Sequence, residues 1–275
     1  MNYNAIPKAN LHTHSIYSDG NDTPEEIVRE AIAQGLVTIG FSDHSQLECG
    51  EDWSLSEAGE KEYKAEVARL RDVYGDRIDI LLGVEQDILS VSSPFGWDYV
   101  IGSVHMIPRG GVYHPVDLGR EELCKAVQTF FEGDFYLFAR EYYALVAQLH
   151  QRTSCDIVGH FDLLTKFNEG NVLFDENDPR YLRCALEALD ALLEKDVIFE
   201  INTGAISRGY RRTPYPAPIF LQRIAEKRGR VTFSSDCHRK EWLLTGHREA
   251  LQYARAAGLG SVAVRTRKGW EEFSL

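Results

Sequence analysis

The stretch Asn10-Leu11-His12-Thr13-His14, near the start of the chain, decides how the rest of the sequence is interpreted. Residues 5–11 predict the lead into a short β-strand that ends at His14. Side chains at positions i and i+2 of a strand point to the same side, so His12 and His14 would aim both imidazoles at one point. Neutral imidazole nitrogens in this arrangement suit a divalent metal ion. Such pairs also occur as structural core residues, so the interpretation depends on the rest of the chain.

Side chains of the same kind recur at or just after the ends of later apolar runs. Six of the nine histidines, together with several carboxylates, occupy such positions. A single histidine at a strand end usually caps or hydrogen-bonds, but six at strand ends are far less expected by chance. The candidate ligands besides His12 and His14 are His44, Glu85, His105, His160, Asp236 and His238, with Asp19 in the first loop.

Short apolar runs alternate with helical patterns along the chain. We expect strands after the first at residues 37–42, 78–84, 99–104, 156–159, 197–202 and 231–235. We expect helices at 24–35, 57–74, 135–152, 180–195, 219–228 and 246–257, and one beginning at Arg120. Seven strand–helix units predict an α/β fold with a parallel barrel, as one domain over residues 1–275. A doubly wound open sheet is the alternative, but it would gather ligands at one crevice rather than at nearly every strand end.

Composition narrows the class of partner. The net charge of −12 argues against nucleic acid or an anionic membrane as the main partner. The sequence contains no apolar stretch of membrane-spanning length and no basic leader, so we expect a cytoplasmic protein. Its five scattered cysteines lack a Cys-x-x-Cys pair and therefore indicate neither a disulfide framework nor a zinc ribbon. The oligomeric state is left open.

The candidate ligands form a set too large for one tetrahedral ion. Two or three ions that share a carboxylate are indicated, and Glu85 is the best candidate for the shared group. Zinc, iron and manganese all accept such nitrogen and oxygen donors. Clustered ions with open positions suit the hydrolysis of a phosphate ester. Asp43, Asp87 and Asp162 lie next to candidate ligands, where they would either orient imidazoles or be solvated.

A loop rich in arginine is the candidate phosphate-binding segment. Arg208, Arg211 and Arg212 follow the sixth expected strand, and the guanidinium fork matches phosphate oxygens. A solvated loop is the alternative. A second candidate segment is the long loop expected at 108–119, where His114 would touch substrate or nothing.

Eight short motifs together resemble the polymerase-and-histidinol-phosphatase (PHP) superfamily. The resemblance covers nearly the whole chain, and within the superfamily the spacing is most similar to PHP-type histidinol-phosphate phosphatases. The motifs are His12-Thr13-His14-Ser15, Ser18-Asp19-Gly20, Ser42-Asp43-His44, Gly83-Val84-Glu85, Gly102-Ser103-Val104-His105, Gly159-His160-Phe161-Asp162, Glu200-Ile201-Asn202-Thr203 and Ser235-Asp236-Cys237-His238.

The resemblance implies a distorted seven-stranded (β/α) barrel that holds three divalent ions. One ion would take His12, His14, Glu85 and Asp236; the second would take Glu85, His105 and His160; the third would take Asp19, His44 and His238. Some members of the superfamily have histidine in the first loop where this chain has Asp19, and a carboxylate favours a harder ion there.

The resemblance also implies a reaction, the hydrolysis of L-histidinol phosphate to L-histidinol and phosphate in histidine biosynthesis. A metal-bridging hydroxide would attack phosphorus in line, and an arginine of the 208–212 loop would hold the charge. Glu85, Asp236 and His238 are the residues expected to take part in catalysis. Asp162 or Glu200 would face the amino group and imidazole of the substrate.

Three other functions compete with this one. A PHP phosphoesterase acting on nucleotides or another small phosphate ester would share the same ligands. An amidohydrolase also begins with His-x-His after its first strand, but it usually needs a bridging lysine that is not found here. A non-catalytic proofreading or regulatory module would normally have lost ligands, whereas this chain keeps all of them.

Overall fold

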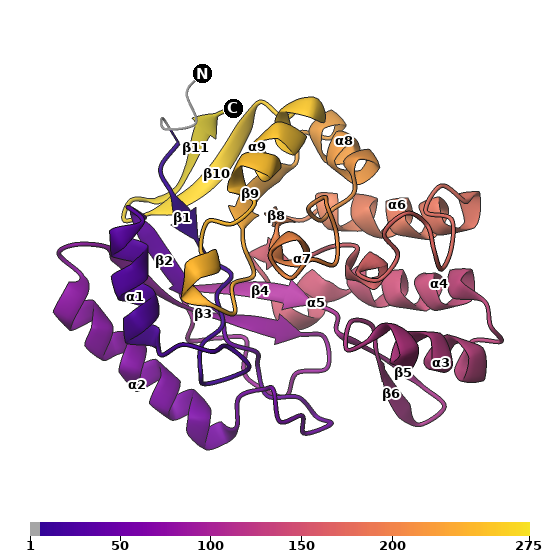
Figure 1. Ribbon diagram of the computed structural model, residues 1–275, viewed down its shortest axis with the longest axis horizontal. Helices are drawn as coiled ribbons and strands as arrows, with labels where there is room; N and C mark the ends of the chain where they lie inside the picture. The colour runs from indigo at the N-terminus through magenta and orange to yellow at the C-terminus, as the bar shows by residue number, and fades with distance from the viewer. Residues whose placement is uncertain (1–5) are drawn as a thin grey trace.

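The computed structural model describes residues 6–275; Ala5, at the start of the first predicted strand segment, lies outside the described residues. A sheet of seven parallel strands occupies the centre, in the order β1-β2-β3-β4-β7-β8-β9. Figure 1 shows helices arranged around it. The strands are β1 (Ala9–Asn10), β2 (Thr38–Phe41), β3 (Asp79–Asp87), β4 (Tyr99–Ser103), β7 (Ile157–Val158), β8 (Ile198–Asn202) and β9 (Arg230–Ser234).

The two ends of this sheet approach each other just beyond β1 and β9. The backbone N–H of His14 donates to the carbonyl of Cys237 (2.8 Å), and the N–H of Cys237 donates to the carbonyl of His12 (3.0 Å). The Asn10 side chain makes two hydrogen bonds with Ser235. Asn10 Nδ2 donates to Ser235 Oγ (2.8 Å), and the Ser235 backbone N–H donates to Asn10 Oδ1 (3.1 Å). The sheet is therefore a nearly closed parallel barrel, which confirms the expected fold class.

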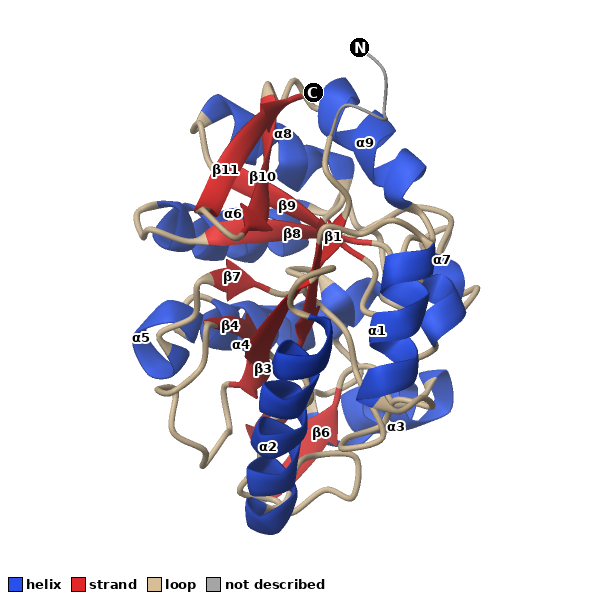
Figure 2. Cartoon of the chain, turned by 90° about the vertical axis from the view of Figure 1, so that its left-hand side faces the viewer, coloured by secondary structure: helices blue, strands red, loops and turns tan. Residues whose placement is uncertain are grey.

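Helices cover the outside of the barrel (Figure 2). The first helix begins as its sequence predicts, because Thr23 and Glu26 form a reciprocal capping box with Pro24 at the first position. The α-helices are α1 (Pro24–Ala33), α2 (Glu57–Tyr74), α3 (Arg120–Phe130), α4 (Phe135–Val146), α5 (Leu149–Thr153), α6 (Pro179–Leu193), α7 (Gly204–Ser207), α8 (Pro218–Glu226) and α9 (His247–Ala256). Two 3₁₀ turns are η2 (Leu163–Thr165) and η3 (Lys240–Trp242).

A buried tyrosine fills the barrel interior. Tyr99 packs with Leu11 and Ile101, and its hydroxyl donates to the carbonyl of Phe41 (2.9 Å). A Cβ atom at Gly83 would lie 2.2 Å from the Tyr99 ring, so this strand position must be glycine for the ring to fit. The interior is thus a packed core, and a ligand-binding cavity must lie above it, at the strand ends.

Two segments differ from the sequence prediction. The expected long loop at 108–119 is mostly a hairpin, β5 (Met106–Arg109) and β6 (Val112–Pro115). Gly110 and Gly111 both have positive φ (63° and 76°), which suits a two-residue hairpin turn, whereas Pro108 in the first strand hid the strand pattern. The C-terminal tail is a second hairpin, β10 (Ser261–Thr266) and β11 (Gly269–Ser274), which packs beside β9.

Several elements also differ from prediction in length, the first strand and the fourth expected helical region most of all. The first strand is only two residues long, and the chain continues beyond it through a single bridge between Thr13 and Cys237. The helix expected at 135–152 is broken into α4 and α5.

Among residues 6–275, no helix is both long enough and apolar enough to cross a lipid bilayer.

Candidate metal centre

The barrel brings all nine predicted ligands together at the carboxyl ends of its strands. Parallel strands end at one rim, so residues far apart in sequence meet there. His12 and His14 follow β1 with ring centroids 5.2 Å apart, as the i, i+2 spacing predicts. The other ligands lie after or near the ends of their strands: His44 after β2, Glu85 in β3, His105 after β4, His160 after β7, and Asp236 and His238 after β9, with Asp19 in the first loop.

Four donor atoms surround the first candidate position. Glu85 Oε2 lies 3.2 Å from His12 Nε2 and 3.5 Å from His14 Nε2. Asp236 Oδ1 lies 3.4 Å from His14 Nε2 and 3.8 Å from His12 Nε2. Ligands of one tetrahedral ion, at ~2.0–2.2 Å from it, are about 3.3–3.6 Å apart. The spacing therefore fits an ion held by these four side chains.

The other carboxylate oxygen of Glu85 faces a second group. Glu85 Oε1 lies 3.3 Å from His105 Nε2 and 2.9 Å from His160 Nε2, and it also accepts a bond from the Ser103 hydroxyl (2.6 Å). The two oxygens of this buried side chain therefore point to two different sets of imidazoles. This geometry suits a carboxylate shared between two ions.

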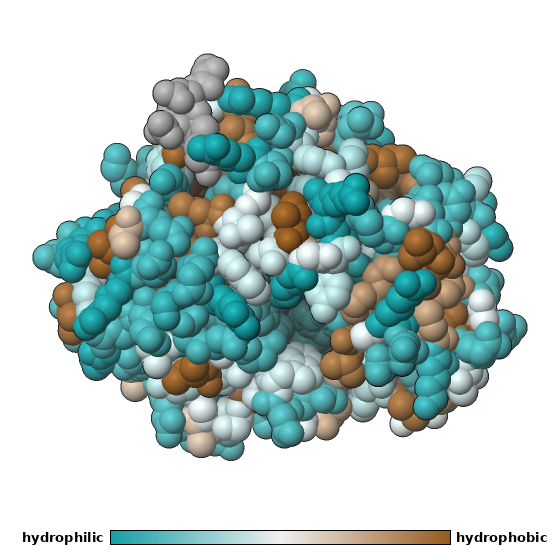
Figure 3. Space-filling view, in the orientation of Figure 1, coloured by the Kyte–Doolittle hydropathy of each residue, from teal (hydrophilic) through white to brown (hydrophobic). Residues whose placement is uncertain are grey.

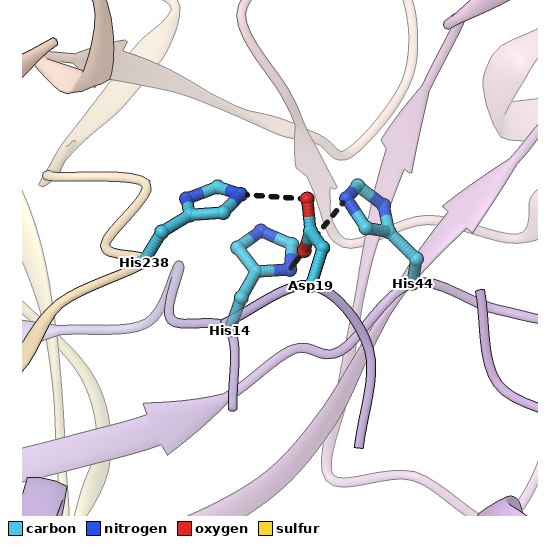
Figure 4. Close-up of side chains that lie close together, drawn as sticks. All are labelled: His14, Asp19, His44 and His238. Atoms are coloured by element: carbon cyan, nitrogen blue, oxygen red, sulfur yellow. Dashed lines mark hydrogen bonds and ion pairs between the residues drawn. The ribbon is translucent and has the colours of Figure 1, made fainter. Parts of the chain in front are cut away.

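Asp19 is the centre of a third group, drawn in Figure 4. Its Oδ1 lies 3.6 Å from His14 Nδ1 and 3.6 Å from His44 Nε2, and its Oδ2 lies 3.1 Å from His238 Nε2. His44 also faces the first group, because its Nδ1 lies 2.9 Å from Glu85 Oε2. The three groups are thus continuous rather than separate.

Several donor atoms in the cluster are buried without a hydrogen-bond partner among residues 6–275. Buried polar atoms are normally paired, and an unpaired one needs an explanation such as an ion. These atoms are His12 Nε2, both ring nitrogens of His14, Glu85 Oε2 and His160 Nδ1. A bound cation would satisfy most of them at once, so the residues present fit a multinuclear metal centre.

Two carboxylates behind the cluster orient its imidazoles. Glu200 Oε2 lies 2.9 Å from His12 Nδ1, and Asp87 Oδ2 lies 3.1 Å from His105 Nδ1. A proton on each Nδ1, donated to the carboxylate, leaves Nε2 free as the metal ligand. The suggestion that Glu200 faces substrate is wrong, because its side chain is buried beneath His12. Asp87 takes the orienting role rather than the solvated one.

The charge states of the central groups suit ligation. Burial opposes ionisation of Glu85, but His12, His105 and His44 outweigh it and hold its pKa well below the usual range. Burial also opposes ionisation of Asp236, where Arg208 and His12 lower the pKa in the same way. Burial and the neighbouring His238 and His44 lower the pKa of His14 to about 3. Ionised carboxylates and a neutral imidazole are the forms that bind metal.

A cavity of about 560 Å³ opens above the cluster. Figure 3 shows a hollow near the centre of the face seen in Figure 1, among hydrophilic and neutral residues. The cavity size suits a small organic molecule. Its lining includes seven of the nine predicted ligands, namely Asp19, His44, Glu85, His105, His160, Asp236 and His238.

Of the three predicted phosphate-binding arginines, one lines this cavity. Arg208 donates from Nη2 to Asp236 Oδ2 (2.8 Å), and its Nη1 lies 3.0 Å from His238 Nδ1. Arg211 instead donates to the carbonyl of Thr165 (2.8 Å) and pairs with Glu176 (3.3 Å). Arg212 is exposed at the surface. The short helix α7 places only Arg208 over the cluster.

Two other predicted substrate contacts lie outside the cavity lining. His114 is buried in β6 with Nε2 3.1 Å from the Arg109 carbonyl and its ring on Phe130. Side chains alternate along a strand, so the neighbours of His114 line the cavity and His114 does not. Asp162 is buried, accepts from the Ala217 backbone (2.9 Å), and burial raises its pKa to about 6.

The cavity is also lined by residues outside the predicted ligand set. Glu51 and Trp53 come from the β2–α2 loop, and Asp117 and Lys166 form an ion pair (3.0 Å) on another wall. Burial raises the pKa of Asp117, but the positive charge of Lys166 outweighs burial and lowers this pKa to about 2. No motif marks Glu51 or Trp53; the only signal is their place in a polar loop that follows a ligand-bearing strand.

Comparisons with known proteins agree with this architecture. A family model described as "PHP domain" matches residues 10–204. A protein of Deinococcus radiodurans named "Probable histidinol-phosphatase" is 30% identical, over 94% of this chain and 96% of the relative. A "Histidinol-phosphatase" of Lactococcus lactis subsp. lactis is 30% identical over 72% of both chains.

A solved structure shows the same fold. The crystal structure of histidinol phosphate phosphatase from Lactococcus lactis subsp. lactis, complexed with zinc, L-histidinol and phosphate, aligns with a TM-score of 0.70 and 24% identity, over 96% of this chain and 98% of that one. With the matched family model, the near-complete overlap with the Deinococcus relative and the ligand-bearing barrel, the chain belongs to the PHP domain family.

Proposed function

We propose that this chain hydrolyses the phosphate monoester of L-histidinol phosphate, releasing L-histidinol and phosphate, as a step of histidine biosynthesis in the cytoplasm. The observation that carries the proposal is the cluster of unpaired imidazole and carboxylate donors at the floor of a cavity that fits a small ester. The names of the Deinococcus and Lactococcus relatives support L-histidinol as the alcohol portion of the ester.

Three divalent ions are proposed for the cluster. His12, His14, Glu85 and Asp236 would hold one, and Glu85 would share the second with His105 and His160. The third would lie among Asp19, His44 and His238. Zinc is the first metal to test, because it occupies the Lactococcus structure; iron and manganese accept the same donors. Such ions would lower the pKa of water and neutralise charge on the phosphate.

Arg208 is the proposed phosphate-binding arginine. Its guanidinium lines the cavity while Asp236 and His238 hold it from behind. A guanidinium has five N–H donors, so the bond to Asp236 leaves others for phosphate oxygens. Because the side chain is already held in place, little conformational entropy is lost when phosphate binds. Arg208 would stabilise charge that builds on the phosphate in the transition state.

The proposed catalytic residues Glu85, Asp236 and His238 act through charge and position. Glu85 and Asp236 stay ionised, so they keep negative charge at the centre when ions bind. Asp236 has φ of 47°, a left-handed conformation that is rare outside glycine and is often found at functional sites. His238 lies between Asp19 and Arg208 and lines the cavity, and in this proposal it would contact a phosphate oxygen.

Removal of one carboxylate tests the proposal. Asp236→Ala should lose most phosphate release from L-histidinol phosphate and bind less metal, because it removes a ligand and the partner of Arg208. Asp196→Ala, at an exposed carboxylate outside the cavity, is the matched control. Wild-type turnover and full metal content in Asp236→Ala would show that the centre is assigned wrongly.

A further inference from the structure

One wall of the cavity carries no proposed metal ligand apart from His44. It belongs to the loop between β2 and α2, from which Glu51 and Trp53 line the cavity. The Trp53 ring packs edge-on against two imidazoles, with ring centroids 4.8 Å from that of His44 and 5.9 Å from that of His105. Trp53 therefore borders the metal cluster, and Glu51, two residues earlier in the chain, lies on the same wall.

The loop is held in a defined position. The backbone N–H of Leu55 donates to the carbonyl of His44 (2.9 Å), which ties the far end of the loop to a proposed ligand. The Ser54 hydroxyl donates to the carbonyl of Glu51 (2.8 Å). Across the cavity mouth, the Tyr113 hydroxyl in β6 donates to the carboxylate of Glu48. Glu51 is thus presented to the cavity by a loop that is anchored at two points and braced by one internal hydrogen bond.

The carboxylate of Glu51 makes no hydrogen bond or ion pair within residues 6–275. The other cavity carboxylate outside the ligand set, Asp117, is already neutralised by Lys166. Glu51 is half-buried, so a substrate that fills the cavity would remove water from it. A charge that loses water without gaining a partner is costly, and a cation on the substrate would offset that cost.

We propose that Glu51 is a specificity-determining residue that pairs with the ammonium group of the substrate's alcohol portion. This inference rests on the proposed function. The phosphate is drawn to the floor by Arg208 and the cluster, so the rest of the ester extends toward the wall. An amino group beside the phosphate-bearing carbon is cationic at neutral pH, and Glu51 is the cavity carboxylate outside the ligand set that lacks a partner among residues 6–275. Esters without a cation, or with a further anion, are disfavoured there.

A comparison of two substrates tests this role. Wild type and Glu51→Gln, both metal-loaded, are assayed with L-histidinol phosphate and with its analogue that lacks only the amino group. Wild type should prefer the amino ester, and Glu51→Gln should reduce the ratio of the two kcat/KM values by roughly 10- to 100-fold. Asp52→Asn removes the same charge from the exposed neighbour outside the cavity lining, and it should keep the ratio.

Each result is decisive. An unchanged ratio in Glu51→Gln, or an equal fall in Asp52→Asn, would overturn the pairing. An equal loss for both esters would also overturn it, since Glu51 would then act on the imidazole or on the fold, and metal content would separate these two. If wild type cleaves p-nitrophenyl phosphate but not L-histidinol phosphate, the proposed function itself fails, a result distinct from an unchanged ratio with active wild type.

Discussion

Glu200→Gln is the most informative change to the metal centre that leaves every proposed ligand in place. Glu200 accepts four hydrogen bonds, two on each carboxylate oxygen. On Oε1 it accepts from the His160 backbone N–H (2.6 Å) and from Asn202 Nδ2 (2.7 Å). On Oε2 it accepts from the Ser234 hydroxyl (2.6 Å) and faces His12 Nδ1 (2.9 Å). Burial opposes its ionisation, but His12 lowers its pKa and keeps it charged.

Glutamine can replace only one of these oxygens, because its NH₂ group donates and does not accept. If the NH₂ group faces His160 and Asn202, the His160 backbone N–H and Asn202 Nδ2 both lose their acceptor. Each unsatisfied buried donor costs about 1–3 kcal/mol of stability. With NH₂ toward His12, the imidazole must take the tautomer that carries its proton on Nε2. That nitrogen then cannot ligate a metal ion. Either orientation damages the centre.

We expect Glu200→Gln to bind metal about 10- to 100-fold more weakly, equal to about 1.4–2.7 kcal/mol. Metal affinity is measured by competition with a chromophoric chelator, and metal content by elemental analysis after dialysis. Glu226→Gln, an exposed substitution on α8, is the matched control. Metal affinity within twofold of wild type in Glu200→Gln would refute the reasoning that Glu200 sets the tautomer of His12.

Three further predictions follow from other contacts. In Gly204→Ala, the new Cβ would lie 2.8 Å from the Asp236 side chain, so phosphate release should fall about tenfold or more. Arg208→Lys should lower kcat/KM by at least about tenfold, since a lysine lacks the guanidinium fork, whereas Arg211→Lys, outside the cavity, should change it less than about threefold. Burial lowers the pKa of His247 to about 4, so as the pH falls this histidine is protonated in the unfolded chain before it is protonated in the folded one. The free energy of unfolding should therefore drop by up to about 3 kcal/mol between pH 6.5 and 4. Urea titrations should show that His247→Leu removes this drop.

Each of these has a contradicting result. Full activity in Gly204→Ala would show that Asp236 has room to move. Equal losses in Arg208→Lys and Arg211→Lys would mean that both arginines act on the fold rather than on phosphate. The same pH dependence of stability in His247→Leu and wild type would mean that folding does not lower the pKa of this imidazole.

The sequence predicts which side chains gather at the barrel rim, because in a parallel barrel this depends on where each strand ends. In parallel strands, the residue after each strand lies at the same rim, so His44 and His160 can be assigned without knowing side-chain detail. The i, i+2 spacing places His12 beside His14 for the same reason. Strand number follows from counting apolar runs, even where the strand itself shrinks to two residues, as in β7.

The substrate side of the site is harder to predict, because loops position it and tertiary contacts decide which way each side chain faces. Arg208 and Arg211 are equivalent in sequence, but α7 turns one toward Asp236 and the other toward Thr165. The sequence places His114 in a loop, whereas the structure places it in a hairpin strand, where the alternation of side chains directs the ring inward. Glu51 carries no local signal, since its proposed role depends on its lack of a partner within the described residues 6–275.

Phosphate release from L-histidinol phosphate by metal-loaded protein tests the central claim most directly. Nucleoside monophosphates and p-nitrophenyl phosphate are assayed beside it, each with and without prior removal of metal by a chelator. We expect metal-dependent turnover with kcat/KM for L-histidinol phosphate at least about 100-fold above the other esters, equal to about 2.7 kcal/mol of discrimination. Equal or faster turnover of nucleotides, or no phosphate from any ester with metal bound, would contradict it.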